Sequence, residues 1–390
     1  MRWLIGVLGL LLVAVVGVLA LAPGVVERSQ NRLRPELAPA SVSAAGRQLH
    51  QRLRLADLHS DTFLWHRNVL KRAERGHVDV PRLQAGGVAL QVFSAVTKSP
   101  SGQNYESNDA DSDTITALVV AQRWPAATWT SLLERALYQA RRAEQAARSS
   151  DLELIRNRAQ LTDFLSRWNA ASTPRPVAAL LATEGAHPLE GEIDHLEALW
   201  AAGYRMLGLH HFFDNRLGGS LHGRNKGGLT AFGRAVVDAA EARGFIIDVA
   251  HSSAQSVTDV LDRVSRPVVL SHTGMAGACS TPRNIPDSLM QRIAVNGGLI
   301  GIGYWDAAVC DIRPAGIART IAYAVRLLGD RAVALGSDFD GATTVAFDTS
   351  RLALLVDALL AEGLSETQIA GIMGENQLRF LERWLPADSS

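Results

Sequence analysis

The chain has 390 residues, of which 47% are hydrophobic and 20% are charged. This length and composition suit one large α/β barrel with insertions and an ample apolar core. The 39 basic residues balance the 39 acidic ones, and there is no basic stripe or zinc-finger spacing, so nucleic-acid-binding classes are excluded and no nucleic-acid partner is expected.

At the N-terminus, residues 3–22 carry no charge and are rich in Leu, Val and Gly. Twenty such residues in a helix match the thickness of a bilayer core, whereas a buried soluble helix is the alternative. The Ala20-Leu21-Ala22 sequence resembles a signal-peptidase site, but the length of the run also suits an uncleaved anchor. We therefore expect a signal peptide or membrane anchor over 1–25, a connector over 26–50, and an exported, periplasmic or extracytoplasmic domain over 51–385.

Short apolar runs recur along that domain and alternate with segments of helical periodicity. Most runs are apolar throughout, as in parallel strands covered on both faces. Strand and helix alternating eight times predicts a (β/α)₈ TIM barrel, with an open doubly wound sheet as the competitor. The runs are 55–60, 88–96, 176–185, 204–211, 244–251, 267–272, 297–304 and 332–339.

Helical patterns lie between these runs, and two connections are long. Residues 229–244 predict a helix that stops at Gly244, and residues 126–168 predict a helical segment within the connection 97–175. Residues 212–228 contain five glycines, which predicts a loop over the mouth of the barrel. For the two cysteines, Cys279 and Cys310, small buried thiols are favoured over a single bridge.

Polar side chains gather at the C-terminal ends of six of the eight runs. In a (β/α)₈ barrel these ends converge on one face, where active sites are built. Burying so many ionisable groups together is unfavourable unless a cation compensates them. The sequence therefore predicts a metal centre from His59, Asp61, Glu184, His211, His251, His272 and Asp338.

The ligand types narrow the choice of metal. His59 and Asp61 form an H-x-D pattern, and on an extended strand both side chains would reach one ion; Asp57 would orient an imidazole or cap the strand. Imidazoles and carboxylates without thiolates suit Zn²⁺, Mn²⁺, Fe²⁺ or Co²⁺. Five ligands are about right for two metals sharing a carboxylate, with Glu184 as the bridge and a hydroxide between the ions.

Other catalytic chemistries lack their motifs. Ser271-His272 has no G-x-S-x-G elbow around it, and neither cysteine lies in a recognisable motif. The glycines of 212–228 fit neither a phosphate-binding loop nor a dinucleotide fingerprint, so nucleotide binding has no support.

Taken together, the motifs resemble the renal (membrane) dipeptidase family of zinc peptidases, in the same order and from about residue 55 to 380. The similarity is interrupted where Thr183 precedes the bridging glutamate in place of an aliphatic residue, and at Trp200 and Tyr204. The matching segments are 57-DLHSD-61, 79-DVPRLQAGGVALQVFS-94, 182-ATEGAHPLEG-191, 248-DVAHSS-253, 271-SHTG-274, 280-STPRNIPD-287 and 335-LGSDFDG-341.

The resemblance implies a role for each candidate residue. His59 and Asp61 would bind one zinc, His251 and His272 the other, and Glu184 both. His211, rather than its neighbour His210, would polarise the substrate, and Arg283 would receive the substrate's terminal carboxylate. Asp338 would be the general acid/base, with Asp340 as the fallback.

Three hypotheses follow, and the leading one is a two-zinc dipeptidase that acts on small dipeptides, including those with a D-residue. The second is another metal-dependent amidohydrolase, acting on N-acyl amino acids, cyclic amides or lactones. The third is a membrane-tethered binding protein that has lost turnover. Family members are often homodimers, so the resemblance also implies a homodimer.

Overall fold

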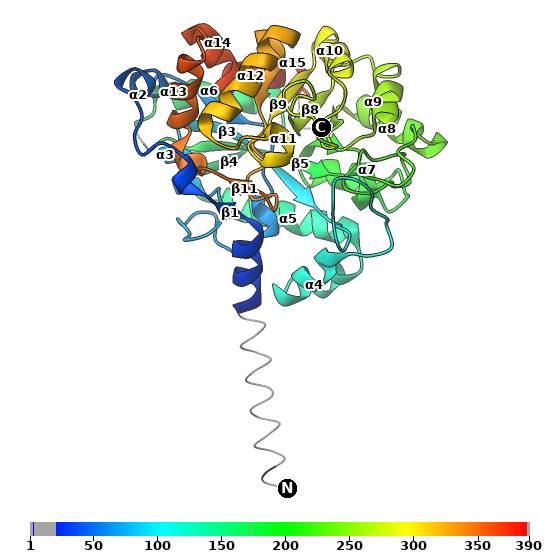
Figure 1. Cartoon of the computed structure of the whole chain (residues 1–390). Coiled ribbons are helices and arrows are strands. Elements are labelled where there is room, and N and C mark those ends of the chain that lie inside the picture. The colour runs from blue at the N-terminus through cyan, green and yellow to red at the C-terminus, as the bar shows by residue number, and fades with distance from the viewer. Residues whose placement is uncertain (1–2, 4–20, 173, 388–390) are drawn as a thin grey trace.

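Eight parallel strands close into a barrel in the computed structural model, which describes residue 3, residues 21–172 and residues 174–387 (Figure 1). The sheet runs in the order β3-β2-β10-β9-β8-β7-β6-β5, and β3 also pairs with β5 and closes the ring. The predicted (β/α)₈ barrel is confirmed and the open sheet is excluded. The strands are β2 Leu55–Asp57, β3 Val88–Val96, β5 Val177–Glu184, β6 Tyr204–Gly208, β7 Ile246–Asp248, β8 Val269–Thr273, β9 Leu299–Ile302 and β10 Val333–Leu335.

Burial explains why the strands are apolar throughout. Every residue of β3 and β5 is buried, because one face of each strand lines the barrel interior and the other packs under helices. The helices form the outer layer (Figure 1). They are α3 Val80–Ala85, α7 His195–Ala201, α8 Ala231–Arg243, α9 Ala254–Leu261, α10 Asp287–Val295, α11 Asp306–Val309, α12 Pro314–Leu328, α13 Ala353–Ala361, α14 Glu366–Ala370 and α15 Asn376–Trp384.

Helix α8 shows how local sequence sets the element boundaries. The Thr230 hydroxyl accepts a hydrogen bond from the Gly233 backbone N–H at 2.9 Å and caps the first turn. Gly244 ends the helix in the left-handed conformation, with φ 102°, which glycine adopts without steric penalty. The predicted stop at Gly244 is confirmed.

The connection between β3 and β5 differs from its prediction. The single helical segment expected over 126–168 is wrong: a 3₁₀ turn at Ala126–Trp129 is followed by α5 Leu132–Ala146, the short strand β4 Leu152–Leu154 and α6 Arg158–Ala170. Strand β4 pairs with β5 outside the barrel. It was not predicted because the stretch around it has a helix-forming composition. Before it, α4 Thr114–Ala121 lies apart from the helical layer, below the barrel in Figure 1.

The predicted connector over 26–50 has secondary structure of its own. Residues 21–30 are helical, β1 Arg32–Leu33 pairs with β11 Thr344–Val345, and α2 Ala44–His50 follows. The leader predicted over 1–25 falls mostly on residues 1–2 and 4–20, outside the described residues. Within the residues that the structure describes, no helix is both long and apolar enough to cross a membrane.

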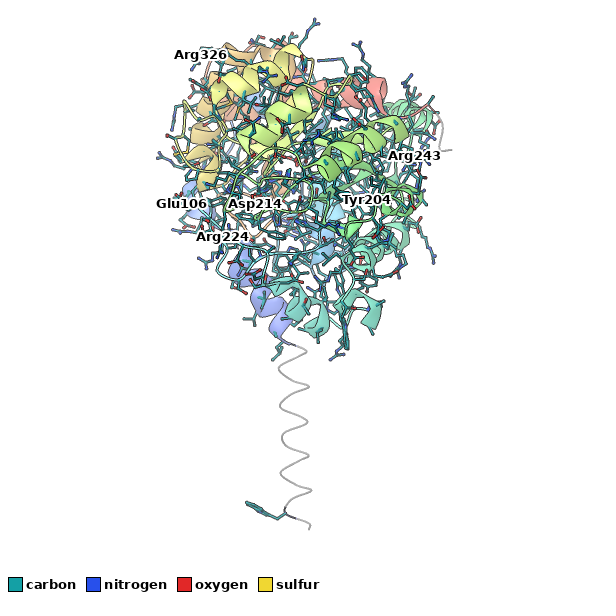
Figure 2. The ribbon with its side chains drawn as sticks, turned by 90° about the vertical axis from the view of Figure 1, so that its right-hand side faces the viewer. Glu106, Tyr204, Asp214, Arg224, Arg243 and Arg326 are labelled. Carbon is teal, nitrogen blue, oxygen red and sulfur yellow. A yellow bond between two sulfur atoms is a disulfide. The ribbon has the colours of Figure 1, made fainter. Side chains whose placement is uncertain are left out.

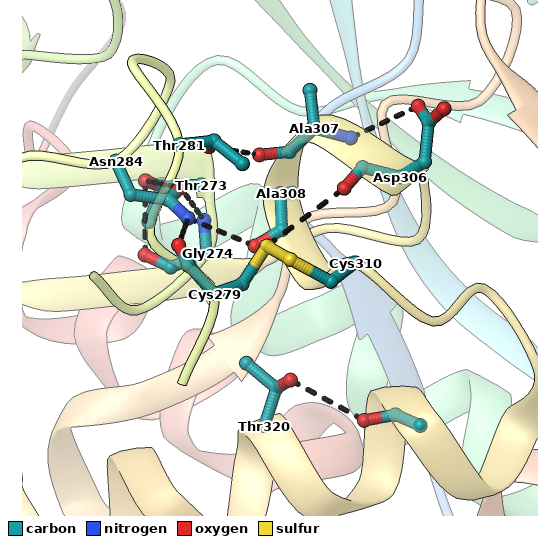
Figure 3. The surroundings of a disulfide bond; sticks show 11 residues. Thr273, Gly274, Cys279, Thr281, Asn284, Asp306, Ala307, Ala308, Cys310 and Thr320 are labelled. Atoms are coloured by element: carbon teal, nitrogen blue, oxygen red, sulfur yellow. Dashed lines mark hydrogen bonds between the residues drawn. A yellow bond between two sulfur atoms is a disulfide. The ribbon is translucent and has the colours of Figure 1, made fainter. Parts of the chain in front are cut away.

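The two cysteines form a disulfide, so the preference for free thiols is wrong (Figure 3). Cys279 follows β8 and Cys310 follows α11, and the pairing of β8 with β9 brings their Cα atoms to 5.6 Å, within the range that a bridge spans. Asn284 donates to the backbone oxygens of Cys279 (2.8 Å) and Ala308 (2.9 Å). The loop that carries Arg283 is thereby fixed beside α11.

Two loops meet over the C-terminal end of the barrel. In the predicted loop 212–228, the Asp214 carboxylate accepts hydrogen bonds from the backbone N–H groups of Ser220 (2.9 Å) and Asn225 (2.7 Å). Arg224 of the same loop pairs with Asp109 of the β3–α4 connection at 2.6 Å. Figure 2 shows Arg224 near Asp214 and Glu106 on this side of the molecule. These contacts hold the loop against its neighbour.

Candidate metal centre

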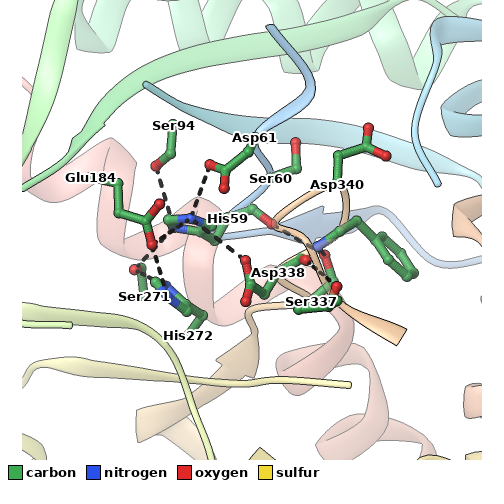
Figure 4. A network of polar contacts seen from close by, with 12 residues as sticks. His59, Ser60, Asp61, Ser94, Glu184, Ser271, His272, Ser337, Asp338 and Asp340 are labelled. Carbon is green, nitrogen blue, oxygen red and sulfur yellow. Dashed lines mark hydrogen bonds and ion pairs between the residues drawn. The ribbon is translucent and has the colours of Figure 1, made fainter. Parts of the chain in front are cut away.

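The seven predicted strand-end residues converge in overlapping groups of ligand atoms. Figure 4 shows five of them: His59, Asp61, Glu184, His272 and Asp338. Glu184 is the last residue of β5. Its Oε1 lies 3.0 Å from His251 Nε2, 3.4 Å from His272 Nε2 and 3.6 Å from His59 Nε2, and its Oε2 lies 3.6 Å from His211 Nε2. Asp61 and Asp338 approach His59 Nε2 at 3.4 and 4.0 Å.

The H-x-D pair reaches the centre in a different way from that predicted. Strand β2 ends at Asp57, and Asp61 has φ −98° and ψ 29° at the start of a 3₁₀ turn, Thr62–Leu64, so His59 and Asp61 do not alternate along one extended strand. The turn brings the Asp61 carboxylate back towards the His59 ring. Asp57 does not orient an imidazole: its carboxylate accepts from the backbone N–H groups of His59 and Ser337, both at 3.0 Å, and so joins β2 to the end of β10.

Several nitrogen and oxygen atoms that could bind a metal are buried here and have no hydrogen-bond partner. They include His59 Nε2, Asp61 Oδ1 and Glu184 Oε2. Nε2 of His251 and Nε2 of His272 face each other at 2.9 Å. The ligand atoms form three overlapping groups, and within each group the atoms lie within 4.8 Å of one another. The groups are His59, Glu184 and His272; Glu184, His211 and His251; and His59, Asp61 and Asp338.

This donor set fits divalent metal ions. Buried polar atoms are almost always paired, so converging lone pairs without a hydrogen-bond partner are arranged as the ligands of a cation. Nitrogen and carboxylate oxygen ligands suit zinc and its first-row neighbours. Glu184 belongs to two of the groups, and both of its carboxylate oxygens are directed at histidines.

Burial and mutual charge set the protonation of these ligands. Burial, above all, lowers the pKa of His251 and of His272 well below the usual histidine value, and Arg283 adds to this. Burial alone would raise the pKa of Glu184, but His211 and His59 hold that pKa well below its usual range. Neutral His251 and His272 beside an ionised Glu184 are the forms that bind metals. For His59, burial lowers the pKa but the Glu184 and Asp61 carboxylates outweigh it and raise that pKa well above the usual histidine value.

Asp338 and His251 both adopt the left-handed backbone conformation, with φ of 55° and 60°. Non-glycine residues in this region are strained by about 1–2 kcal/mol, and such strain concentrates at functional sites. A Cβ at Gly341 would lie 1.9 Å from Asp338 Oδ1, so the glycine leaves room for the carboxylate. Burial raises the pKa of Asp338 well above its usual value, and the nearby Glu184 and Asp61 carboxylates contribute.

The neighbouring candidates His210 and Asp340 point elsewhere. The His210 ring contacts the Ser252 hydroxyl at 2.9 Å, whereas His211 faces Glu184. Asp340 is fully buried, and its carboxylate accepts from the Thr62 hydroxyl (2.9 Å), the His77 backbone N–H (2.6 Å) and the Arg67 guanidinium. The geometry thus brings His211 and Asp338 to the centre.

A cavity of about 610 Å³ opens over the centre, and Arg283 lines it. Arg283 Nη2 donates to the backbone oxygen of His272 at 2.6 Å, while its buried Nε has no partner. The guanidinium lies 5.3 Å from the Trp305 ring, and the Trp305 indole N–H donates to the Tyr105 hydroxyl at 2.9 Å. Tyr105 and Trp305 also line the cavity but were not predicted, because neither lies at a polar strand end.

His222 is a further histidine that the sequence prediction missed. It comes from the glycine-rich loop, stacks on Phe212 at 4.8 Å and meets the His251 ring edge-on at 5.3 Å. Its Nδ1 contacts the Tyr105 backbone oxygen at 3.0 Å, and burial lowers its pKa to about 3. The sequence did offer one signal for His222: it is a histidine in a loop that was predicted to lie over the mouth of the barrel.

Comparison with known proteins identifies the family of the chain. A family model described as membrane dipeptidase (peptidase family M19) matches residues 43–385. The dipeptidase aclJ of Aspergillus oryzae is 27% identical over 387 residues, covering 90% of this chain and 84% of that protein.

Two solved structures share the fold. The probable dipeptidase PvdM of Pseudomonas aeruginosa has a TM-score of 0.72 at 18% identity and covers 89% of this chain and 98% of its own. A metallopeptidase of Rhodobacter sphaeroides has a TM-score of 0.66 at 23% identity and covers 85% of this chain and 99% of its own. Since the family model spans nearly the whole barrel, the chain belongs to the membrane dipeptidase family, peptidase family M19, and is a hydrolase of the metallopeptidase class.

Proposed function

We propose that this chain hydrolyses the peptide bond of small dipeptides at a centre that holds two zinc ions. The observation that carries the proposal is the convergence of His59, Asp61, Glu184, His251 and His272 with unpartnered, buried ligand atoms. His59 and Asp61 would hold one ion and His251 and His272 the other, with Glu184 shared. The bound ions would supply Lewis acidity for the scissile carbonyl and acidify the attacking water at neutral pH.

The proton transfers are assigned to Asp338. Its Oδ1 lies 4.0 Å from His59 Nε2, at the edge of the metal ligands and inside the cavity. We assign it to take the proton of the attacking water and to deliver it to the leaving amine. His211 is assigned to polarise the carbonyl oxygen. Its Nδ1–H donates to the Lys98 backbone oxygen at 3.2 Å, so donation from Nε2, which lies 3.6 Å from Glu184 Oε2, uses the doubly protonated ring.

Arg283 is assigned to the substrate's terminal carboxylate. It is 1% exposed, lines the cavity and keeps one buried N–H without a partner. A guanidinium binds a carboxylate through two parallel hydrogen bonds, and burial strengthens that contact. This arrangement favours substrates with a free carboxylate beside the scissile bond.

Dipeptides with a C-terminal D-residue belong to the proposed substrate class. The Rhodobacter sphaeroides relative was solved with a phosphinate mimic of the dipeptide L-Ala-D-Ala. The cavity here, about 610 Å³, has room for either configuration of the second residue.

A substrate panel tests the proposal. The full chain, purified in detergent, is assayed with L-Ala-L-Ala, L-Ala-D-Ala and N-acetyl-L-alanine, with and without a strong chelator, and its metal content is measured. We expect both dipeptides to be cleaved, chelator to abolish the activity, and zinc to restore it. Metal-loaded protein that cleaves only the N-acyl compound would replace the dipeptidase with the second amidohydrolase hypothesis.

We also propose that the chain is exported and retained by its N-terminal run. The uncharged residues 3–22 have the length of a membrane-spanning helix. The Cys279–Cys310 disulfide supports the same location, because such bridges persist in oxidising compartments outside the cytoplasm.

A further inference from the structure

The helical residues 21–30 are fixed to the barrel by a buried charge. Glu27 is 1% exposed, and its two carboxylate oxygens accept from Arg67 Nε and Arg75 Nε, both at 2.5 Å. One turn later, the Asn31 side chain accepts from the Ala342 backbone N–H at 2.9 Å, and β1 then pairs with β11. This helix is therefore part of the folded domain.

The same helix forms one wall of the substrate cavity. Val26 and Gln30 line the cavity together with Ile115 and Leu118 of α4, and the metal centre lies at its inner end. The helix and α4 lie at the same end of the molecule in both views (Figures 1 and 2). The outer part of the cavity therefore lies between these two helices.

Exposed apolar side chains gather on the helices around this part of the cavity. Of the eight large hydrophobic side chains exposed among the described residues, five belong to the helix 21–30, to α4 or to the turn after it. Helix α4, with the sequence TITALVVA, is apolar on nearly every side and carries no charge. We call this set the apolar rim; it consists of Leu21 (71% exposed), Val25 (59%), Val26 (38%), Val120 (38%) and Trp129 (42%).

The chain itself indicates what covers the rim. The uncharged run 3–22 ends where the rim begins, and its twenty residues would span about 30 Å as a helix, the thickness of a bilayer core. Glu27 fixes the helix only five residues beyond Ala22, about 8 Å along a helix. A domain attached so closely to a membrane-spanning run must have its rim at the bilayer surface.

We propose that the apolar rim rests on the lipid bilayer, so that the cavity opens at the membrane surface and substrates enter from there. The inference rests on the proposed anchor role of residues 3–22 but is independent of the proposed dipeptidase chemistry. Exposed apolar side chains with a tryptophan at the edge of the patch are typical of membrane-contacting surfaces.

Spin labels on the full chain test the proposal. Both natural cysteines are paired, so a single introduced cysteine can be labelled selectively. Val120→Cys places the label on α4 of the rim, and Val295→Cys is the matched control, because Val295 is 86% exposed and ends α10, at the other end of the molecule (Figure 1). Both proteins are reconstituted into phosphatidylcholine nanodiscs, and collision rates with oxygen and with a water-soluble nickel chelate are measured.

We expect the label at 120 to collide severalfold more with oxygen and severalfold less with the chelate than the label at 295. Aqueous collision rates at both positions, or lipid-like rates at both, would overturn the proposal, as would a full chain that does not enter nanodiscs. Trp129→Cys, labelled in the same way, must follow Val120→Cys. The readout needs no catalysis, so inactive protein with a lipid-exposed label would contradict the proposed function while supporting the orientation.

Discussion

Two buried carboxylates on one loop, Asp338 and Asp340, differ in their partners: Asp338 lies at the candidate metal centre, and Asp340 is bound by the residues beside it. Both residues are almost inaccessible, and both have a left-handed backbone, with φ of 55° and 64°. Asp340 has hydrogen-bond or ion-pair partners for both carboxylate oxygens, from Thr62, His77 and Arg67. The Oδ1 atom of Asp338 instead lies 4.0 Å from His59 Nε2 of the metal centre.

The same contrast extends to their surroundings. Around Asp340, the cluster Glu27–Arg67–Asp340 alternates negative and positive charge, and its carboxylates are paired. Around Asp338, negative carboxylates and histidines converge, and several of their atoms have no hydrogen-bond partner. Burial alone therefore does not distinguish the two carboxylates: the charge of Asp340 is compensated by Arg67, whereas several buried atoms around Asp338 have no hydrogen-bond partner.

Removing Glu184 should have the largest effect, because its carboxylate is common to two ligand groups. We expect Glu184→Ala to lose metal at both positions and to lower kcat/KM for a dipeptide by at least about 10³-fold, the order of effect of removing a major electrostatic stabiliser. Metal analysis alongside kinetics measures this. A variant that keeps two equivalents of metal would contradict the sharing of Glu184.

The paired variants Asp338→Asn and Asp340→Asn test the comparison directly. Asp338→Asn should keep its metal and lower kcat by about 10²–10⁴-fold, because a proton carrier is lost. Asp340→Asn should leave Glu27 as the only carboxylate paired with Arg67 and Arg75, and lower the free energy of unfolding by about 3–5 kcal/mol, with a much smaller change in kcat. Chemical denaturation and steady-state kinetics on both proteins give the answer, and the reverse outcome would exchange the two roles.

The sequence was sufficient to predict the barrel and the residues that converge. The runs that lead to His59, Glu184 and His272 predict both the fold and the site. Burial on two faces makes each strand apolar, and the barrel topology brings the C-terminal ends of the strands together.

Features that depend on contacts between distant segments could not be predicted. Strand β4 forms within a helix-rich stretch because it pairs with β5, and Cys279 meets Cys310 because β8 pairs with β9. Glu27 is an ordinary charged residue in the sequence, and only the fold places Arg67 and Arg75 around it. His222 and Tyr105 reach the cavity on loops whose course no periodic pattern encodes.

Glu27→Gln should have a moderate effect, on stability rather than on chemistry. The amide keeps the shape of the carboxylate but removes the charge between Arg67 and Arg75, so we expect the free energy of unfolding to fall by about 1–3 kcal/mol. Denaturation of the full chain in detergent measures this. Glu74→Gln is the control, because Glu74 is exposed and its ion pair with Arg28 is long, at 4.0 Å, and contributes little. Equal stability of the two variants would mean that Glu27 does not fix the helix.

Arg283 and Arg67 are two buried arginines that differ in the same way as the two carboxylates. Replacing each by lysine should give the smallest of the expected effects. Arg67 is paired with Glu27 and Asp340, whereas Arg283 keeps a buried N–H free beside the cavity. Lysine retains the charge but cannot form the two parallel bonds of a guanidinium. Arg283→Lys should therefore raise KM for L-Ala-L-Ala by about tenfold, the loss of roughly one charged hydrogen bond, and leave KM for the C-terminal amide unchanged. Arg67→Lys should lower stability and leave both KM values unchanged, because its partners belong to the protein. If Arg283→Lys raised KM equally for the acid and the amide, the residue would shape the cavity in general, and the carboxylate would have to be recognised elsewhere.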